Sequence, residues 1–236
     1  MFINTLKLIA ICMVLLIKMT FSSQAQSSFH IEADVVSNYV WRGQMINSNL
    51  NIQPTLAYTS PGEVFTLGAW GSYGVGSYYS EINLFASLSL GPVTLSLVDY
   101  FVDSPIESPG FFDYKKQSTA HALEVIGEWE VSENFPLLLT WGTFIFGDDL
   151  NANEERMFSS YLETAYGFEL ETTTFHVFMG VTPWESFYAE SFNPINIGFG
   201  AEKSIAINGH FSIPVSASLS YNPYEDRVFM VLGISF

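Results

Sequence analysis

Apolar and polar residues alternate along most of this chain, in runs of about ten residues that recur from Phe29 to Phe236. In the first run, Phe29–Arg42, most alternate residues are aromatic or aliphatic, and charged residues such as Glu32 and Asp34 stand between them. Successive side chains of a strand point to opposite faces, so each run predicts a strand with one apolar and one polar face. Three runs are apolar on both faces, and their register stays open: Val64–Tyr73, Val93–Val102 and Leu137–Phe146.

The connections between these runs alternate strictly between short and long. The short ones are Pro61-Gly62, Gly91-Pro92, Ser132–Asn134, Glu171–Thr173 and Asn208-Gly209. The long ones are Gly43–Asn49, Gly74–Tyr79, Asp103–Ser118, Gly147–Met157, Pro183–Asn193 and Asn222–Asp226. Outer-membrane barrels sort their loops in this way, with short periplasmic turns and longer extracellular loops. The sequence therefore predicts an all-β fold, a transmembrane antiparallel up-and-down β-barrel of about 12 strands, with 10 strands as the alternative.

The first 25 residues have the pattern of a cleaved secretory signal. Lys7 precedes ten uninterrupted apolar residues, Leu8–Ile17, and Ser23-Gln24-Ala25 provides a small-residue cleavage site. A transmembrane anchor is the alternative, but ten residues span only about 15 Å as a helix, half of a bilayer core of about 30 Å. We therefore divide the chain into a signal peptide, residues 1–25, and an outer-membrane barrel, residues 26–236. The only cysteine, Cys12, lies within the signal.

The last run ends the chain on an aromatic residue. Its alternate positions form an apolar row that we interpret as an outer-membrane insertion signal: Val228, Met230, Leu232, Ile234 and Phe236. Such a signal predicts the barrel-assembly machinery as a partner during biogenesis. Aromatic residues at strand ends are typical of the two interfacial girdles of these barrels. We place Trp129 and Phe236 in the periplasmic girdle, and Trp41 and Tyr73 in the outer one.

Composition and charge exclude several classes of protein. The chain has 24 acidic and 8 basic residues, a net charge of −16, and only 14% charged residues against 16% aromatic ones. Low charge and high apolarity exclude a disordered chain. The acidic balance argues against nucleic acid as a partner, since phosphate binding needs clustered Lys and Arg. It argues equally against docking on an anionic cytoplasmic membrane surface.

Four segments resemble a known family. They are Val36-Ser37-Asn38-Tyr39-Val40-Trp41-Arg42-Gly43, Ile52-Gln53, Gly68-Ala69-Trp70-Gly71-Ser72 and Glu81-Ile82-Asn83-Leu84-Phe85. This pattern resembles the TorF-type porin family, specifically over residues 34–90, with departures at Asn83 and Phe85. The resemblance implies an outer-membrane barrel that forms a pore, and it assigns no role to any single residue.

The polar face of the predicted strands would line the lumen. The candidate lumen residues are Glu32, Asp34, Arg42, Glu81, Glu124, Glu128, Glu163, Glu169, His176 and Glu202. Acids dominate this set, and pores lined by acids favour cations. The alternative is a plugged barrel, because small barrels fill their interior with side chains and open aqueous channels appear at 16–18 strands. Inward-facing Trp70, Phe85, Phe178 and Phe229 are consistent with a narrow lumen.

Two other functions remain open at this stage. A non-conducting structural or adhesive barrel would agree with a narrow lumen. An outer-membrane acyl hydrolase would need a serine, a histidine and an acid on one face. Ser118 and His121 are three residues apart and would point to opposite faces of an extended strand. The chain also lacks the G-x-S-x-G and H-E-x-x-H motifs, so we expect no enzyme activity.

The expected partners follow from the fold. They are outer-membrane lipid and lipopolysaccharide, and small ions or polar solutes that pass through the barrel. We expect no cofactor and assign no metal ligands. The acid-rich outer loops match no calcium-loop spacing, which favours a solvated rim, and binding of divalent cations that bridge lipopolysaccharide is the alternative.

Overall fold

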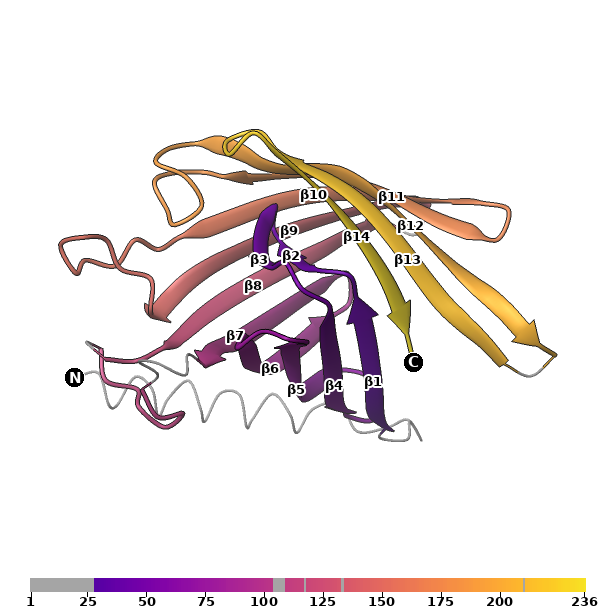
Figure 1. Ribbon diagram of the computed structural model, residues 1–236, viewed down its shortest axis with the longest axis horizontal. Helices are drawn as coiled ribbons and strands as arrows, with labels where there is room; N and C mark the ends of the chain where they lie inside the picture. Colours follow the sequence, from indigo (N-terminus) through magenta and orange to yellow (C-terminus); the bar gives the residue numbers. More distant parts are fainter. Residues whose placement is uncertain (1–27, 104–108, 117, 133, 210) are drawn as a thin grey trace.

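The computed structural model describes residues 28–236 except 104–108, 117, 133 and 210, and shows a barrel with a hairpin inside it (Figure 1). The predicted signal peptide, residues 1–25, lies outside the described residues. No helix within the described range is long and apolar enough to cross a bilayer.

Over the described residues, twelve antiparallel strands close into the barrel wall, which confirms the predicted fold class. The wall strands are β1 (Ser28–Val36), β4 (Asn51–Thr59), β5 (Phe65–Gly74), β6 (Ser80–Leu90), β7 (Val93–Asp103), β8 (His121–Ser132), β9 (Phe135–Gly147), β10 (Ser160–Leu170), β11 (Thr173–Thr182), β12 (Asn193–Asn208), β13 (Phe211–Asn222) and β14 (Arg227–Ser235). Each strand pairs with its neighbours in chain order, and β1 pairs with both β4 and β14.

The connections alternate in length as the sequence predicts. The turns β6–β7 and β10–β11 leave two residues each between the strand ends, Gly91-Pro92 and Glu171-Thr172. The links β9–β10 and β11–β12 are much longer and extend from the opposite end of the barrel (Figure 1). Glu171 and Gly91 have positive φ values of 56° and 67°, as tight hairpin turns require.

The first predicted strand does not continue to Arg42. It ends at Val36, and the chain then forms a separate hairpin of β2 (Tyr39–Trp41) and β3 (Gln44–Asn47). The two residues between β2 and β3 have φ values of 49° and 75°, the positive pair expected of a type I′ hairpin turn. The prediction of an outer loop at Gly43–Asn49 is therefore wrong. The alternation of apolar and polar residues does not reveal this turn, because the strands of a hairpin inside the barrel are as extended as the wall strands and have the same two-residue repeat.

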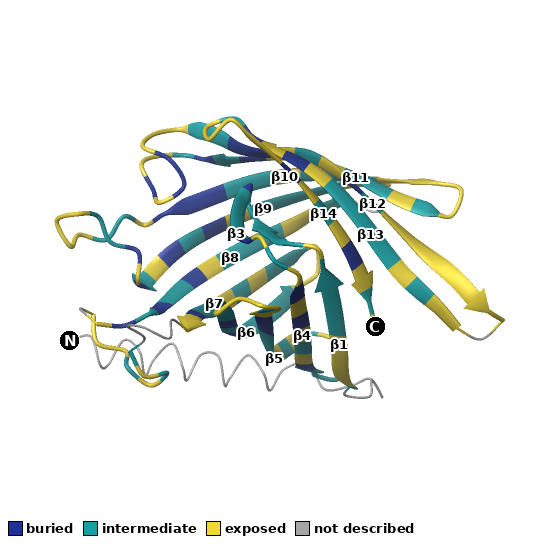
Figure 2. Ribbon diagram, in the orientation of Figure 1, coloured by how far each residue is buried: buried dark blue, intermediate teal, exposed yellow. Residues whose placement is uncertain are grey.

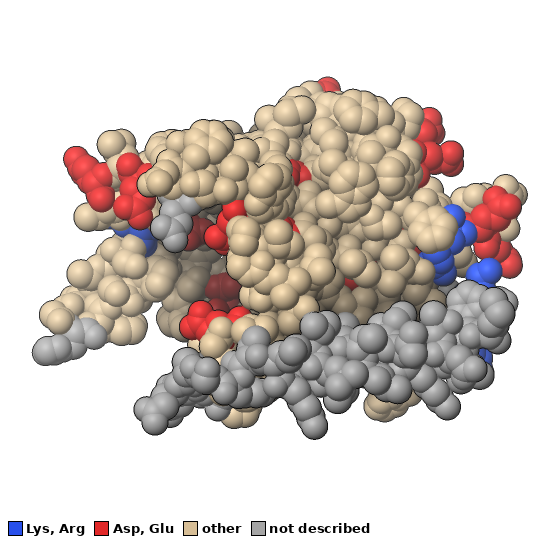
Figure 3. Space-filling view, turned by 180° about the vertical axis from the view of Figure 1, so that it is seen from behind, with Lys and Arg blue, Asp and Glu red and all other residues tan. Residues whose placement is uncertain are grey.

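The outer face of the wall is apolar. In β14 the row Val228, Met230, Leu232, Ile234 and Phe236 is 41 to 65% exposed, whereas Phe229 between them is 6% exposed. Figure 2 shows a similar alternation of buried and exposed residues along several other strands. In Figure 3 charged side chains gather toward the two ends, and uncharged side chains cover most of the wall between them. An exposed apolar surface of this size is typical of a region that contacts a membrane or another protein.

The seam between the first and last strands is short. Within the described residues, β1 pairs with β14 only at Asp34↔Ser235, Val35↔Ile234 and Val36↔Gly233, while all of Ser28–Val36 pairs with β4. Two backbone hydrogen bonds between Ala33 and Phe236, of 3.1 and 3.0 Å, extend the seam at one end. The beginning of β14, from Arg227, lies beside the β2–β3 hairpin rather than β1.

Candidate functional site in the barrel lumen

The β2–β3 hairpin occupies the lumen, because it contacts the wall on several sides. The ring of Tyr39 lies 5.6 Å from that of Trp70 in β5, and the ring of Trp41 lies 5.7 Å from that of Tyr100 in β7. On the other side, Asn222 at the end of β13 donates a 3.0 Å hydrogen bond to the carbonyl of the turn glycine. The prediction that Trp41 belongs to the outer aromatic girdle is therefore wrong.

Arg42, at the turn of the hairpin, makes a two-pronged ion pair with Glu124 of β8. Its Nη1 lies 2.6 Å from Oε1 and its Nη2 lies 3.1 Å from Oε2. Nη1 also donates to the hydroxyl of Tyr188 at 2.6 Å, and the guanidinium lies 4.4 Å from the centre of the Trp41 ring. The two charged side chains are only 9% and 0% exposed. Removing one partner of such a buried pair typically costs about 3–5 kcal/mol, so this contact fixes the hairpin in the lumen.

Two glycines permit the close approach of hairpin and wall. A Cβ on Gly142 of β9 would lie 2.2 Å from the Glu124 Oε1 atom. A Cβ on Gly43, which has a φ of 75°, would lie 2.0 Å from the carbonyl oxygen of Ile195 in β12. Neither position therefore accepts a side chain without moving the ion pair or the turn.

Two further acids from the predicted set are held by neutral donors. Glu81 of β6 accepts hydrogen bonds from the Tyr79 hydroxyl and, at 2.8 Å, from the Asn83 amide. Glu163 of β10 accepts from the Tyr161 hydroxyl and, at 3.2 Å, from the Asn196 amide of β12. The structure thus brings Arg42 and Glu124 into direct contact and places Glu81 and Glu163 in separate hydrogen-bond groups.

The remaining predicted lumen residues have looser surroundings. Asp34, Glu128 and His176 are half-buried, and the His176 ring stacks 5.8 Å from that of Phe178. Glu32, Glu169 and Glu202 are exposed.

Tyrosines complete this site, and none of them is among the candidate lumen residues predicted from the sequence. Tyr188 comes from the long β11–β12 connection and is 2% exposed, packed with Trp41, Tyr161 and Ile195. Tyr100 donates a 2.8 Å hydrogen bond to the Glu124 Oε2 atom. Tyr161 shares the polar face of its strand with Glu163, so alternation could have placed it inside, whereas the run that contains Tyr100 is apolar on both faces and leaves its register open. Nothing in the pattern indicates that a loop residue such as Tyr188 reaches inward.

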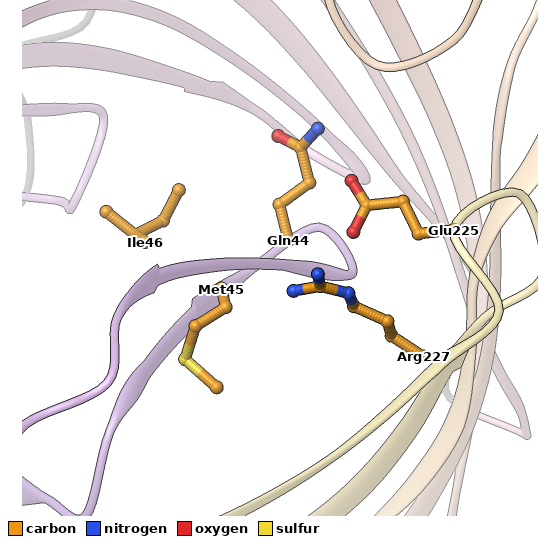
Figure 4. A pocket seen from close by; sticks show the side chains of 5 residues that line it. All are labelled: Gln44, Met45, Ile46, Glu225 and Arg227. Atoms are coloured by element: carbon orange, nitrogen blue, oxygen red, sulfur yellow. The ribbon is translucent and has the colours of Figure 1, made fainter.

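Cavities lie on both sides of the hairpin. One, of about 490 Å³, is lined by Gln44, Met45 and Ile46 of β3 and by Glu225 and Arg227 at the rim of β14 (Figure 4). The other, of about 270 Å³, lies on the side of β6 to β9, and half of its lining residues are aromatic. Ile46 lines both cavities, so β3 forms the partition between them.

A second polar cluster lies on the outer face of the wall. Asp99 of β7 pairs with Leu84 and Leu123 in the sheet, and directly paired residues point to the same face. Its Oδ1 atom lies 2.8 Å from Nδ1 of His121, which is fully buried under the β7–β8 connection. Tyr114 of that connection donates a 2.7 Å hydrogen bond to the Asp99 Oδ2 atom.

The same connection holds the serine considered for a hydrolase. Ser118 donates a 2.7 Å hydrogen bond to Asp113, while the Nε2 atom of His121 lies 2.5 Å from the Phe111 carbonyl oxygen. Serine and histidine are therefore engaged with different partners. Among the described residues, no group of three or more His, Cys, Asp or Glu side chains is arranged to hold a metal ion.

Comparisons with known proteins find similarity only among solved structures, where several chains match. No family model matches the chain, and no curated protein matches it. A solved structure described as "Structure of porin refined at 1.8 angstroms resolution" is similar, with 18% sequence identity and a TM-score of 0.35. The match covers 78% of this chain and 61% of that one, so the chain spans about three fifths of the length of that porin.

Proposed function

We propose that this protein is an outer-membrane porin-like barrel that passes small ions or polar solutes and prefers cations. The observation that carries the proposal is the contrast between the two faces of a closed wall. The outer face exposes an apolar row on each strand, and the inner face holds buried or half-buried acids such as Glu81, Glu124 and Glu128. An apolar exterior suits a bilayer, and acids around a lumen favour cations.

The proposal includes the export signal and the family suggested by the sequence. A cleaved signal over residues 1–25 would deliver the chain to the barrel-assembly machinery, and lipid and lipopolysaccharide would then surround the wall. The resemblance to the TorF-type porin family rests on the segments around Trp41, Trp70 and Asn83. No enzyme activity and no cofactor are part of this proposal.

The β2–β3 hairpin requires a refinement of the cation hypothesis. Glu124 neutralises Arg42 at 2.6 Å and is not free to attract ions. Selectivity should therefore depend on acids away from this pair, such as Glu128 and Asp34. Solutes would pass beside the hairpin, along the cavities on its two sides, or after the hairpin moves.

Conductance in a planar bilayer tests this function. We expect single-channel steps and a reversal potential that shows cation preference in a salt gradient, most clearly below about 0.1 M salt, where the screening length exceeds about 10 Å. The double variant Glu128→Gln/Asp34→Asn should reduce that preference. The matched control Glu154→Gln, in the exposed β9–β10 connection, should not. Anion preference of the unmodified protein would contradict the proposal.

A non-conducting structural or adhesive barrel is the second candidate. It is favoured by the contacts of the hairpin with β5, β7, β8 and β13, which fill the middle of the lumen. Absence of conductance, both in the unmodified protein and after Arg42→Ala, would support it. An acyl hydrolase is the least favoured candidate, because His121 and Ser118 are engaged elsewhere, and an assay of lipid hydrolysis tests it directly.

A further inference from the structure

In the smaller cavity beside the hairpin, half of the lining residues are aromatic. It has a volume of about 270 Å³ and opens toward the end of the barrel with the long connections, where Ala120 and Asp148 line it. Six aromatic side chains from the hairpin, the wall and two connections contribute to its lining: Tyr39, Trp41, Tyr79, Tyr100, Phe144 and Phe187. We call this cavity the aromatic vestibule.

The rings of the aromatic vestibule pack against one another in edge and tilted arrangements, and Trp41 stacks with Phe187. The Trp41 ring lies 5.7 Å from Tyr100 and 6.4 Å from Phe144, and the last two rings lie 5.6 Å apart. On another side, Tyr39 meets Tyr79 edge to face at 6.2 Å. These contacts hold the rings in fixed positions around a small space, as in the aromatic cages that bind quaternary ammonium groups.

The charge around the aromatic vestibule is negative. Its lining includes Glu81 and Asp148 and, among the described residues, no lysine, arginine or histidine. Arg42 lies 4.4 Å from the centre of the Trp41 ring, but Glu124 at 2.6 Å balances its charge. Glu81 is 4% exposed and makes no ion pair with any described residue. A buried carboxylate held only by neutral donors lacks a counter-charge, which a bound cation would supply.

The tyrosine hydroxyl groups of the aromatic vestibule already donate hydrogen bonds to carboxylates. Tyr79 donates to Glu81, and Tyr100 donates to the Glu124 Oε2 atom at 2.8 Å. A sugar, which needs many donors and acceptors, would find few free partners on these tyrosines. A quaternary ammonium ion needs none, since it carries no N–H and interacts with ring faces and a carboxylate at a distance.

We propose that the aromatic vestibule binds a small quaternary ammonium ion of about the size of choline, with its charged group against the rings and near Glu81. The volume agrees with a small ligand, since pockets for drug-sized molecules begin at about 300 Å³. This inference rests on the proposed function in one respect, namely that the lumen is reached from outside. It adds the class of cation that the barrel recognises.

Calorimetric titration of the full-length folded barrel in detergent tests the proposal without relying on conductance. The probes are choline and tetramethylammonium, and the control ligand is 3,3-dimethyl-1-butanol, which has the shape of choline but no charge. We expect saturable binding of both cations in the millimolar range and at least tenfold weaker binding of the neutral alcohol. Folding of every variant is checked by its heat-modifiable migration on a gel.

Two variants separate the contribution of the Glu81 charge to binding from the contribution of the aromatic ring faces. Glu81→Gln keeps the shape of the side chain and should weaken choline binding about tenfold, with little effect on the alcohol. Phe144→Leu keeps an apolar side chain without a π face and should weaken choline binding severalfold. The matched control Glu171→Gln, in the exposed β10–β11 turn, should leave binding unchanged.

Each outcome decides the proposal. Equal binding of choline and the neutral alcohol would show an apolar cavity only, and binding of glucose without choline would show a sugar site, so either would overturn the inference. Absence of choline binding by a folded barrel that conducts would refute the inference alone. Binding of choline by a barrel that does not conduct would support the inference and refute the porin function.

Discussion

The Nδ1 atom of His121 lies 2.8 Å from the Oδ1 atom of Asp99 on the outer, apolar face of the barrel. The other ring nitrogen, Nε2, lies 2.5 Å from the Phe111 carbonyl oxygen, which can only accept a hydrogen bond. Nε2 therefore carries a hydrogen, and the contact with Asp99 needs one more proton on either partner. In both arrangements the pair has no net charge, which makes it compatible with an apolar wall.

The β7–β8 connection covers this pair and is held by its own hydrogen bonds. Tyr114 stacks on the His121 ring at 4.0 Å, and burial together with its hydrogen bond to Asp99 raises the pKa of Tyr114 to about 12. Its hydroxyl therefore stays protonated and donates at neutral pH. Hydrogen bonds from the Ser118 hydroxyl and the Lys115 amide lower the pKa of Asp113.

Replacing His121 should release this connection from the wall. His121→Ala removes the stacking partner of Tyr114 and leaves Asp99 without its shared proton, a loss of about 1–3 kcal/mol for a buried polar group. We expect faster trypsin cleavage after Lys115 or Lys116 in the folded variant. The control His30→Ala, at an exposed histidine of β1, should be cleaved like the unmodified protein. Unchanged cleavage of His121→Ala would show that the pair does not hold the connection.

A double-mutant cycle should reveal the strength of the Arg42–Glu124 pair. Arg42→Met leaves the fully buried Glu124 without its partner and should lower the free energy of unfolding by about 3–5 kcal/mol, measured by urea unfolding in detergent. The double variant Arg42→Met/Glu124→Gln should recover a large part of this loss. Arg227→Met, at an exposed arginine on the rim, is the matched control. Additive losses in the double variant would mean that the two side chains do not couple.

The orientation of the barrel can be tested with single cysteines, since Cys12 is the only native one. A cysteine at Ala152, in the long β9–β10 connection, should react with an impermeant maleimide on intact cells. A cysteine at Pro61, in the short β4–β5 turn, should react only after permeabilisation. The reverse labelling pattern would place the long connections in the periplasm.

Loss of the terminal residue should reduce assembly. Deleting Phe236 removes an outward aromatic that is 65% exposed and two backbone hydrogen bonds to Ala33 that extend the short seam. We expect a severalfold drop in folded, heat-modifiable barrel in the outer membrane. Phe211→Ala, which removes another exposed phenylalanine outside the last strand, should have a much smaller effect. Normal amounts of folded barrel after the deletion would exclude a role of Phe236 in insertion.

Alternation and loop length were sufficient to predict the wall. The barrel is built from a two-residue repeat, so the outward row of β14 and the short turn at Gly91 are visible in the sequence. The placement of Trp41 predicted from the same repeat is wrong, because an extended hairpin in the lumen has the same periodicity as a wall strand. The turn itself was hard to detect, since a positive φ is uncommon for a residue such as Arg42.

The remaining features depend on contacts between segments far apart in the chain. Asp99 fits the apolar face of β7 poorly, and only the folded connection with Tyr114 and His121 explains why a carboxyl is tolerated there. Similarly, the sequence does not distinguish Glu124 from the other lumen acids, and only the folded hairpin places Arg42 against it. Period-2 patterning specifies which face a residue takes, but it contains no information about which partner it meets on that face.

The hairpin in the lumen is joined to the wall at both ends, to β1 through Ser37-Asn38 and to β4 through residues 48–50. A segment tethered this closely has an effective concentration of about millimolar or higher at its own binding surface. Its occupancy of the lumen is therefore an intramolecular equilibrium, independent of the concentration of the protein. A free peptide with the sequence of residues 37–50 would have to exceed that concentration to take its place. Departure of the hairpin is likewise reversible, because the two linkers keep it at the rim of the barrel.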